Sequence, residues 1–230
     1  MAARDPSPRA TRPSASALPQ GARSVGPGRP KDLGKRQAIL DAAKAMFTRH
    51  GFAGVSMDQI AAEAGVSKLT VYSHFGDKEA LFAAAVRAKC EEQLPPDLFA
   101  APRRGSLRTQ LLAIARGFFG LVMSEEAIAM HRMMLGSESD DKLRELFWQA
   151  GPQRVQDSFA EFLRPRVAAG DLLVPDVSRA ASQFFCLLKG EPHARLMCGL
   201  STGPTAAEAR AHIAATVDLF LRAHAAARAP

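Results

Sequence analysis

The chain has 230 residues with a net charge of +7, and 47% of its residues are hydrophobic. This length suffices for a hydrophobic core in one or two domains. No apolar run approaches the ~20 residues that a membrane-spanning helix needs, and the N-terminus lacks the apolar segment of a secretory signal. We therefore expect a soluble cytoplasmic protein with no membrane partner.

The positive charge is concentrated at the N-terminus. Residues 1–36 hold eight lysines and arginines against two aspartates, a net of +6 out of +7. Proline, serine, alanine and glycine dominate the first thirty positions without apolar periodicity, which predicts a disordered basic arm over residues 1–34. The arm either solubilises the chain, or its Gly-Arg-Pro sequence carries Arg29 and Lys31 into a narrow minor groove of DNA. The sequence leaves both interpretations open.

The first predicted helix covers about Lys35 to His50. Gly51 is a typical C-terminal stop, and cations in the last turn suit the helix dipole. Helical periodicity predicts a buried stripe made of Ile39, Ala43, Met46 and Phe47.

Residues 55–75 contain two short helices joined by a tight turn. Ser56 stands at an N-cap position, and Gln59, three residues later, completes a capping box. Gly65 supplies the left-handed conformation that ends a helix, and Ser67 caps the next one. Two such helices form a helix-turn-helix, whose second helix fits the major groove of DNA, although an ordinary helical hairpin has the same pattern.

The second of these helices has two different faces. Val71 and Phe75 are four residues apart and share the face that is expected to be buried. The remaining surface carries hydrogen-bond donors, a methyl group and an aromatic ring but no acid: Lys68, Leu69, Thr70, Tyr72, Ser73 and His74.

The stretch GKRQAILDAAKAMFTRHGF and the stretch VSMDQIAAEAGVSKLTVYSHFGDKEALF together resemble the N-terminal domain of the TetR/AcrR family of transcriptional regulators. The resemblance implies an all-α protein, with a helix-turn-helix DNA-binding domain over 35–82 and a larger helical domain over 83–230 that dimerises and binds a small molecule. It assigns Tyr72, His74 and Lys78 to phosphates, and the groove floor to Lys68, Leu69, Thr70 and Ser73. The cap residues Ser56 and Ser67 complete the candidate surface. Family members more often have a small residue or proline at the position of Leu69, so an unusual base preference is expected.

Lys78 begins a helix that runs towards Gln93, with Asp77 as its cap. A cation is disfavoured at a helix N-terminus, and a bound phosphate would remove that conflict. The alternative is a solvated lysine. Pro95 and Pro96 stop this helix, and residues 94–105 are predicted to be a linker.

The rest of the chain has a helical pattern throughout. Helices are predicted over 106–123, 126–135, 140–149 with a break at Gly151-Pro152, 155–170, 176–199 and 205–227. Pro192 is expected to kink or split the helix over 176–199. The sequences FWQAGP and GDL resemble the AefR-type branch of the same family.

The last two helices are predicted to form a homodimer interface as half of a four-helix bundle. Their apolar faces are made of Phe184, Phe185, Leu188, Val217, Phe220 and Leu221, although these residues equally suit the core of one chain. An apolar ligand pocket is predicted among the middle helices, with walls drawn from Phe118, Val122, Met130, His131, Met134, Phe147, Trp148, Phe159 and Phe184. Core packing is the competing interpretation for each of these residues. His131, Glu138 and His193 are the candidate polar groups of the pocket.

No enzyme signature accompanies these patterns. The histidines form no metal pair, the three cysteines have no metal-like spacing, and inert buried thiols are expected, so neither cofactor nor metal is predicted. Asp140-Asp141 and Glu125-Glu126 stand at helix starts, where capping accounts for them. A helical adaptor that has lost DNA binding would lack the basic face that is present here. The expected function is a repressor that binds a palindromic operator as a homodimer, associates with the nucleoid through DNA, and is released by an unknown small hydrophobic effector.

Overall fold

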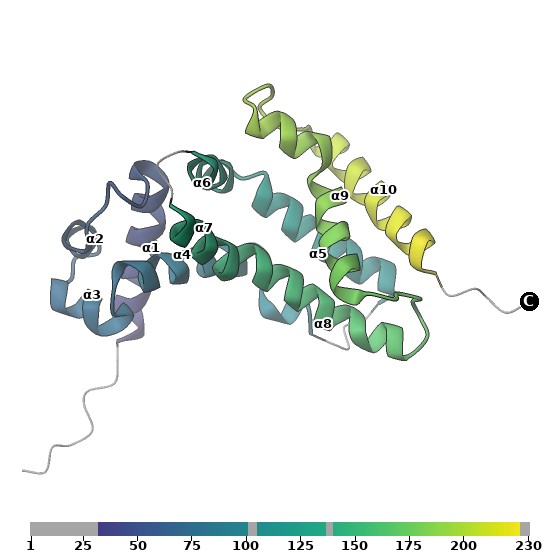
Figure 1. Ribbon diagram of the computed structural model, residues 1–230, viewed down its shortest axis with the longest axis horizontal. Helices are drawn as coiled ribbons and strands as arrows, with labels where there is room; N and C mark the ends of the chain where they lie inside the picture. Colours follow the sequence, from purple (N-terminus) through teal and green to yellow (C-terminus); the bar gives the residue numbers. More distant parts are fainter. Residues whose placement is uncertain (1–31, 101–104, 137–139, 226–230) are drawn as a thin grey trace, which may run out of the picture. The chain divides into compact units, whose positions relative to one another are not determined.

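The computed structural model describes residues 32–100, 105–136 and 140–225 (Figure 1). Within these ranges the regular structure is helical apart from one isolated bridge between Leu172 and Ala225, so the predicted all-α class is confirmed. The helices are α1 Leu33–His50, α2 Met57–Glu63, α3 Lys68–Phe75, α4 Lys78–Gln93, η1 Pro96–Leu98, α5 Leu107–Val122, α6 Glu125–Leu135, α7 Asp141–Trp148, η2 Gln149–Gln153, α8 Arg154–Ala168, α9 Val177–Met197 and α10 Ala206–His224.

The helix α1 begins two residues earlier than expected. The side chain of Asp32 accepts hydrogen bonds from the backbone N–H groups of Gly34 and Lys35, so the aspartate caps the helix ahead of Leu33. Leu33 and Gly34, which the prediction assigned to the arm, therefore belong to α1. Arg29 and Lys31 lie outside the described residues.

The predicted helix-turn-helix is present as α2 and α3. The Oγ of Ser56 accepts from the Gln59 backbone N–H at 3.2 Å, and the Gln59 Oε1 accepts from the Ser56 N–H at 2.8 Å, which is the expected capping box. Gly65 has a φ of 65° in the turn. The Oγ of Ser67 accepts from the Thr70 N–H and starts α3.

A compact aromatic core holds α1 to α4 together. The rings of Phe47, Phe52 and Phe82 lie 5.3 to 5.8 Å apart between centroids, and Val71 on α3 is fully buried against the same cluster. Of the predicted stripe of α1, Met46 is only half-buried. Leu40 and Ala42, which were not part of that prediction, are buried. Residues of α6, α7 and η2, including Met134, join this core, so α4 packs against helices on both sides of the proposed boundary at residue 82.

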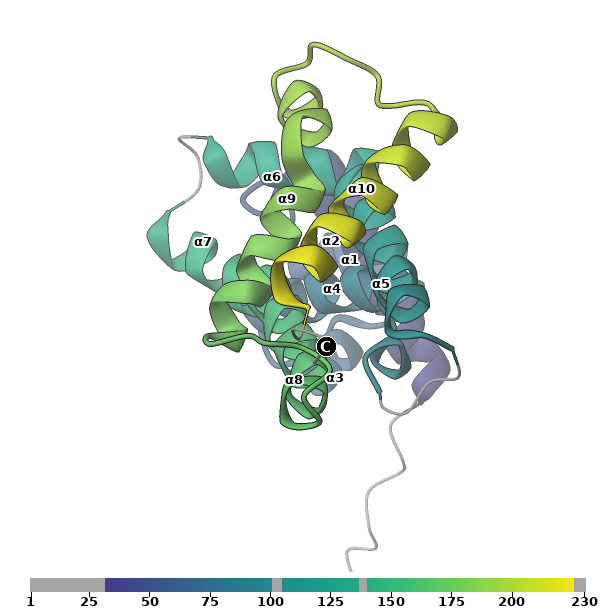
Figure 2. The same ribbon diagram turned by 90° about the vertical axis from the view of Figure 1, so that its right-hand side faces the viewer.

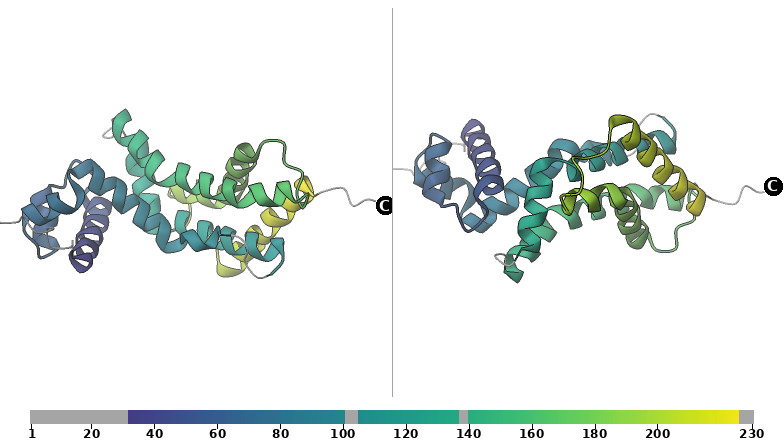
Figure 3. Two further views of the ribbon diagram at one scale, coloured as in Figure 1. Left: turned by 90° about the horizontal axis from the view of Figure 1, so that it is seen from below. Right: turned by 90° about the horizontal axis from the view of Figure 1, so that it is seen from above.

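The second core lies among α5, α8, α9 and α10. Phe159, Phe184, Phe185 and Phe220 form a cluster with ring centroids 4.7 to 6.2 Å apart. The helix α5 packs against both α9 and α10 (Figure 2). In Figure 3, α4 joins the purple and blue helices α1–α3 to the teal-to-yellow helices α5–α10. A displacement of α4 would therefore change the packing of both cores.

The predicted break at Gly151-Pro152 is wrong. A π-helical turn, η2, joins α7 directly to α8. The wider turn tolerates Pro152 because it relieves the clash of the proline ring with the preceding turn. A Cβ on Gly151 would lie 2.9 Å from Cγ1 of Val86, so glycine allows α4 to approach this turn closely.

The predicted interruption near Pro192 is confirmed. Gly190 has a φ of 47° and a ψ of −155° inside α9. Pro192 has no N–H to donate to the carbonyl of Leu188, four residues earlier, and the Nε2 of His212 on α10 donates to that carbonyl instead, at 2.9 Å. The kink is thus stabilised by a neighbouring helix.

We expect the substitution Gly190→Ala to destabilise the fold by about 1–3 kcal/mol, because it forces a Cβ into this backbone conformation. The added Cβ would also lie 3.1 Å from Cε1 of His212. Gly120→Ala is the matched control, since Gly120 lies within α5 and a Cβ there would meet only Oε1 of Gln93, at an ordinary contact distance of 3.6 Å, so alanine should be neutral or stabilising. Urea denaturation at one protein concentration measures both changes, and equal stability of the two variants would contradict the prediction.

Candidate DNA-binding surface and ligand cavity

Four of the six residues predicted on the outer face of α3 are exposed. Leu69 is 79% exposed, and Ser67, Lys68, Tyr72 and Ser73 are exposed beside it, whereas Thr70 and His74 are half-buried. The hydroxyl of Thr70 contacts the Ser67 Oγ at 2.8 Å and so is engaged in the cap. This surface offers an apolar side chain at its centre, with polar groups around it.

Although α3 itself carries no acid, a carboxylate from α2 lies beside its exposed face. Asp58 of α2 pairs with the Nζ of Lys68 at 2.9 Å. Both side chains are more than half exposed, so the pair is weak and solvent-screened. Lys68 can therefore exchange Asp58 for another acceptor at little cost.

Three of the predicted contact residues meet around one hollow. Ser56, Tyr72 and Lys78 line a shallow depression next to the N-termini of α2 and α4. The Nζ of Lys78 lies 4.3 Å from the centroid of the Phe52 ring, and burial lowers the pKa of this lysine. A phosphate in the hollow would meet the Lys78 ammonium at the start of α4, and it would also lie near the Asp77 carboxylate, which already accepts from the Ala80 N–H at 2.7 Å.

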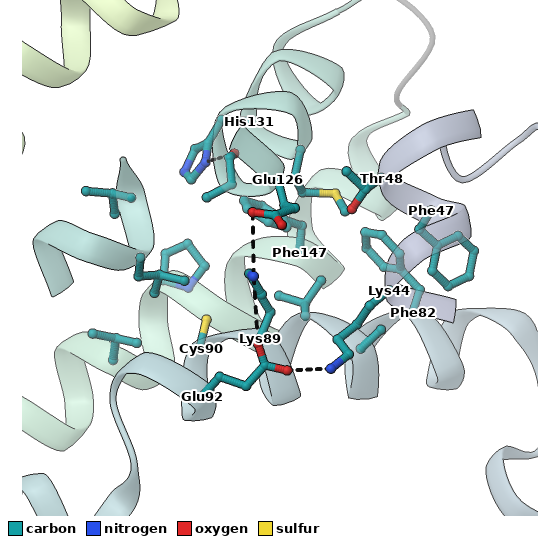
Figure 4. A pocket seen from close by; sticks show the side chains of 18 of the residues that line it. Lys44, Phe47, Thr48, Phe82, Lys89, Cys90, Glu92, Glu126, His131 and Phe147 are labelled. Atoms are coloured by element: carbon teal, nitrogen blue, oxygen red, sulfur yellow. Dashed lines mark hydrogen bonds and ion pairs between the residues drawn. The ribbon is translucent and has the colours of Figure 1, made fainter. Parts of the chain in front are cut away.

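A cavity of about 500 Å³ lies between α1 and α4 on one side and α5, α6, α7, η2, α8 and α9 on the other (Figure 4). Five residues that sequence reasoning assigned to a pocket line it: Phe118, Val122, Met130, His131 and Phe147. Its walls are mainly apolar, but they include seven charged side chains: Asp41, Lys44, Arg49, Lys89, Glu92, Glu126 and Lys189. Its size and character are those of a small-molecule site.

Four of the predicted pocket residues lie elsewhere. Phe159 and Phe184 are fully buried in the second core, and Met134 packs into the first core. Trp148 is 44% exposed and does not line the cavity, so its fluorescence is not a direct reporter of the site. Of the suggested polar groups, Glu138 lies outside the described residues.

Sequence reasoning missed the walls that α1 and α4 provide. These helices contribute apolar, polar and charged groups to the cavity: Lys44, Phe47, Thr48, Phe82, Val86, Lys89, Cys90 and Glu92. Lys44, which lies between alanines in α1, was the available signal, whereas Lys89 has the charged neighbours Arg87 and Glu91 and gave none. Because α1 and α4 also hold α3, any molecule in the cavity contacts the frame of the recognition helix.

A chain of ion pairs crosses the cavity from α1 to α6 (Figure 4). Lys44 pairs with Asp41 at 2.7 Å and with Glu92, and Lys89 pairs with Glu92 at 3.7 Å and with Glu126 at 3.6 Å. Burial opposes the charge of Lys44, but its hydrogen bonds to the two carboxylates raise its pKa. The chain links α1, α4 and α6.

The thiols differ from the expectation of buried, inert cysteines. Burial raises the pKa of Cys90, in the cavity wall, to about 11, so this thiol is inert as predicted. Cys186 and Cys198 are exposed, which corrects the prediction for these two residues. All three are free thiols in the structure.

Within the described ranges, no group of three or more His, Cys, Asp or Glu side chains is placed to hold a metal ion. None of the helices described is long and apolar enough to cross a membrane.

Comparisons with known proteins agree with this geometry. Residues 39–85 match the family described as bacterial regulatory proteins, tetR family, and residues 109–226 match the C-terminal domain of AefR-like transcriptional repressors. An uncharacterised HTH-type regulator of Bacillus subtilis, YdeS, is 31% identical over 56% of this chain, which spans 64% of that relative. RaaS, an HTH-type regulatory protein of Mycobacterium tuberculosis, is 30% identical over 70% of this chain and 71% of its own length. The solved structure of FrrA, named a flavonoid-responsive regulator, matches with 32% identity and a TM-score of 0.67 over 86% of this chain and 100% of its own.

Proposed function

Since the chain belongs to the tetR family of bacterial regulatory proteins, and is a transcriptional regulator rather than an enzyme, we propose that it represses transcription as a homodimer bound to a palindromic operator. A small hydrophobic ligand in the cavity releases it from DNA. It acts in the cytoplasm, associated with the nucleoid through its operator. The observation that carries this proposal is that α1 and α4 both form walls of the cavity and pack against the recognition helix α3.

The DNA contacts divide between the groove and the backbone. Leu69 and its polar neighbours on α3 face the base edges, where an apolar side chain packs against the methyl group of thymine. Phosphate binds in the shared hollow, to Ser56, Tyr72 and Lys78. His74 contacts phosphate from α3, the helix that Ser67 caps. The arm with Arg29 and Lys31 enters the adjacent minor groove.

The homodimer uses a different face of α9 and α10 from the one that sequence reasoning chose. Phe184, Phe185, Leu188, Val217 and Phe220 are buried within the chain's own core, so they are not available to a partner. The large apolar side chains that remain exposed on these helices are Leu187 and Leu219, at 44% and 45%. We assign the interface to this outer face of α9 and α10.

Ligand control follows from the shared walls. A ligand that fits the cavity better in one arrangement of α1 and α4 shifts the population towards that arrangement. In a dimer this changes the separation of the two recognition helices, so operator affinity falls as the ligand binds. The name of FrrA, a flavonoid-responsive regulator, supports a small organic effector.

The function is tested by selecting bound sequences from a random pool of duplex DNA with the full chain, followed by sedimentation of the complex. We expect an inverted repeat bound by two or more copies of the protein. A pool that yields no enriched sequence would favour an adaptor that does not bind DNA, and an asymmetric site bound by one copy would contradict the palindrome.

We expect Lys78→Ala to weaken binding to all DNA sequences alike and to flatten the dependence of log K on log salt by about one unit, because one phosphate contact is lost. Arg210→Ala is the control, since it removes the same charge from an exposed position on α10. Fluorescence anisotropy at several salt concentrations measures both slopes. An unchanged slope for Lys78→Ala would remove this lysine from the phosphate contacts.

A further inference from the structure

The cavity has two polar regions with different electrostatics. One is the chain of ion pairs from Asp41 to Glu126, in which each lysine touches two carboxylates. The other is made of Lys189 on α9 and His131 on α6, which line the cavity, with His193 of α9 packed against His131 outside the lining. Each charged group of the ion-pair chain has a partner of opposite charge, although three carboxylates share two lysines, whereas the ammonium of Lys189 has no such partner among the described residues.

Lys189 lines the cavity and is half-buried. It makes no hydrogen bond or ion pair with any residue in the described ranges, and burial lowers its pKa. The charged form of a partly buried ammonium is costly unless an anion or hydrogen-bond acceptor lies next to it. The cavity therefore contains a cationic group without a partner.

His193 provides a second unsatisfied atom. Its Nε2 is buried and has no hydrogen-bond partner within the part of the chain described, and its ring lies 5.7 Å from that of His131. Burial, followed by the neighbouring charge of Lys189 and by His131, lowers the pKa of His193 to about 4. At neutral pH this imidazole is uncharged and retains its capacity for a hydrogen bond.

His131 has a defined orientation in the cavity wall (Figure 4). Its Nδ1 lies 2.7 Å from the carbonyl of Ala127, and because a carbonyl can only accept, Nδ1 carries the hydrogen. Burial lowers the pKa of His131, so in the neutral ring Nε2 is an acceptor. Phe147 packs edge-on against the same ring at 5.4 Å and holds it in place.

We propose that the effector is a hydrophobic weak acid whose acidic oxygen binds to Lys189 and His131 in the cavity wall, next to His193, while its apolar body fills the cavity. This deepens the proposed function and depends on the cavity being the effector site. The oxygen accepts a hydrogen bond from Lys189 and, where it keeps its proton, donates to Nε2 of His131. A carboxylate and a phenol can both accept from Lys189, and only a group that keeps its proton, such as a phenol, can also donate to Nε2 of His131.

Cationic and uncharged effectors fit the cavity less well. A cation would be repelled by Lys189, and its only acids would be Asp41, Glu92 and Glu126, which are already paired and are 41% to 56% exposed to water. An uncharged apolar molecule would leave the ammonium of Lys189 without a partner and would remove water from it. An acidic oxygen is not repelled by Lys189. It also gives the ammonium an acceptor in place of the water that the ligand removes.

The test measures direct binding to the full chain, without DNA, by isothermal titration calorimetry. The probes are 4-biphenylcarboxylate, 4-hydroxybiphenyl, the uncharged methyl ester of the first and the cationic 4-(aminomethyl)biphenyl. We expect at least one of the two acids to bind about ten-fold or more tightly than the ester and the amine, as for a hydrogen bond to a charged group. The acid that binds more tightly shows whether the effector belongs to the carboxylate or the phenol class.

Lys189→Met should remove this preference by weakening the binding of the acids, whereas the ester should bind at least as tightly as it does to the unmodified protein. Lys142→Met, which changes the charge equally at an exposed position on α7, should retain it. If Lys189→Met does not fold, the affinities of the acids and the ester for the unmodified protein still show whether the cavity prefers an acidic oxygen. Binding of the ester as tightly as both acids, no binding of either acid, or an unchanged preference in Lys189→Met would overturn the proposal.

The same probes, added to the complex with the selected operator, separate this proposal from the proposed function. An acid that binds through Lys189 without releasing DNA supports the subsite and contradicts ligand-controlled release. An ester that releases DNA as well as the acids do would support ligand control and contradict the weak-acid subsite.

Discussion

The double substitution Leu187→Asp with Leu219→Asp is expected to convert the protein to a monomer and to reduce its operator affinity by about a hundred-fold or more. The two leucines are half-exposed on α9 and α10, so the isolated chain tolerates aspartate at both positions. In a two-fold interface each substitution occurs twice, and burying the four carboxylates without partners costs several kcal/mol. The affinity falls because two linked half-site contacts become independent.

Sedimentation velocity measures the oligomeric state, and anisotropy with the selected operator measures the affinity. Leu200→Asp is the matched control, because Leu200 is 67% exposed in the connection between α9 and α10 rather than on the proposed face. The control should remain a dimer with unchanged operator affinity. A double variant that stays dimeric would place the interface elsewhere.

The local features of this chain were predictable from its sequence because they depend on residues three or four positions apart. The capping box of Ser56 and Gln59, the cap at Ser67 and the interruption near Pro192 are all present. Each follows from the hydrogen-bonding capacity of one side chain or the loss of one backbone N–H. The all-α class followed from the same regular periodicity.

The walls of the cavity were less predictable because helical spacing shows that a side chain is buried but not what covers it. Phe118 and Phe159 both belong to apolar stripes, yet the first lines the cavity and the second lies in the middle of a core. The contributions of Lys44 and Lys89 depend on how α1 and α4 lie against α6, which is a tertiary relation. The unexpected π-turn η2 continues the helix from Trp148 into α8, a further contact that no local pattern encoded.

This difference between core and cavity leads to a large expected effect on stability. Phe159→Ala should destabilise the fold by about 3–5 kcal/mol, since it removes a fully buried ring that contacts Phe184, Phe185 and Phe220. Phe147→Ala should cost clearly less, because one side of its ring already faces the open space of the cavity.

The order of the two variants should be reversed for ligand affinity, which Phe147→Ala should lower more than Phe159→Ala. Phe147 lines the cavity and packs against His131, so Phe147→Ala should weaken the binding of 4-biphenylcarboxylate, whereas Phe159→Ala should leave it unchanged wherever the variant is folded. Urea denaturation at one fixed protein concentration gives the stabilities, since the unfolding of a dimer depends on concentration. Calorimetry below the unfolding transition gives the affinities. Equal destabilisation by the two substitutions would show that Phe147 is packed as a core residue, and a loss of affinity in folded Phe159→Ala would extend the ligand site into the second core.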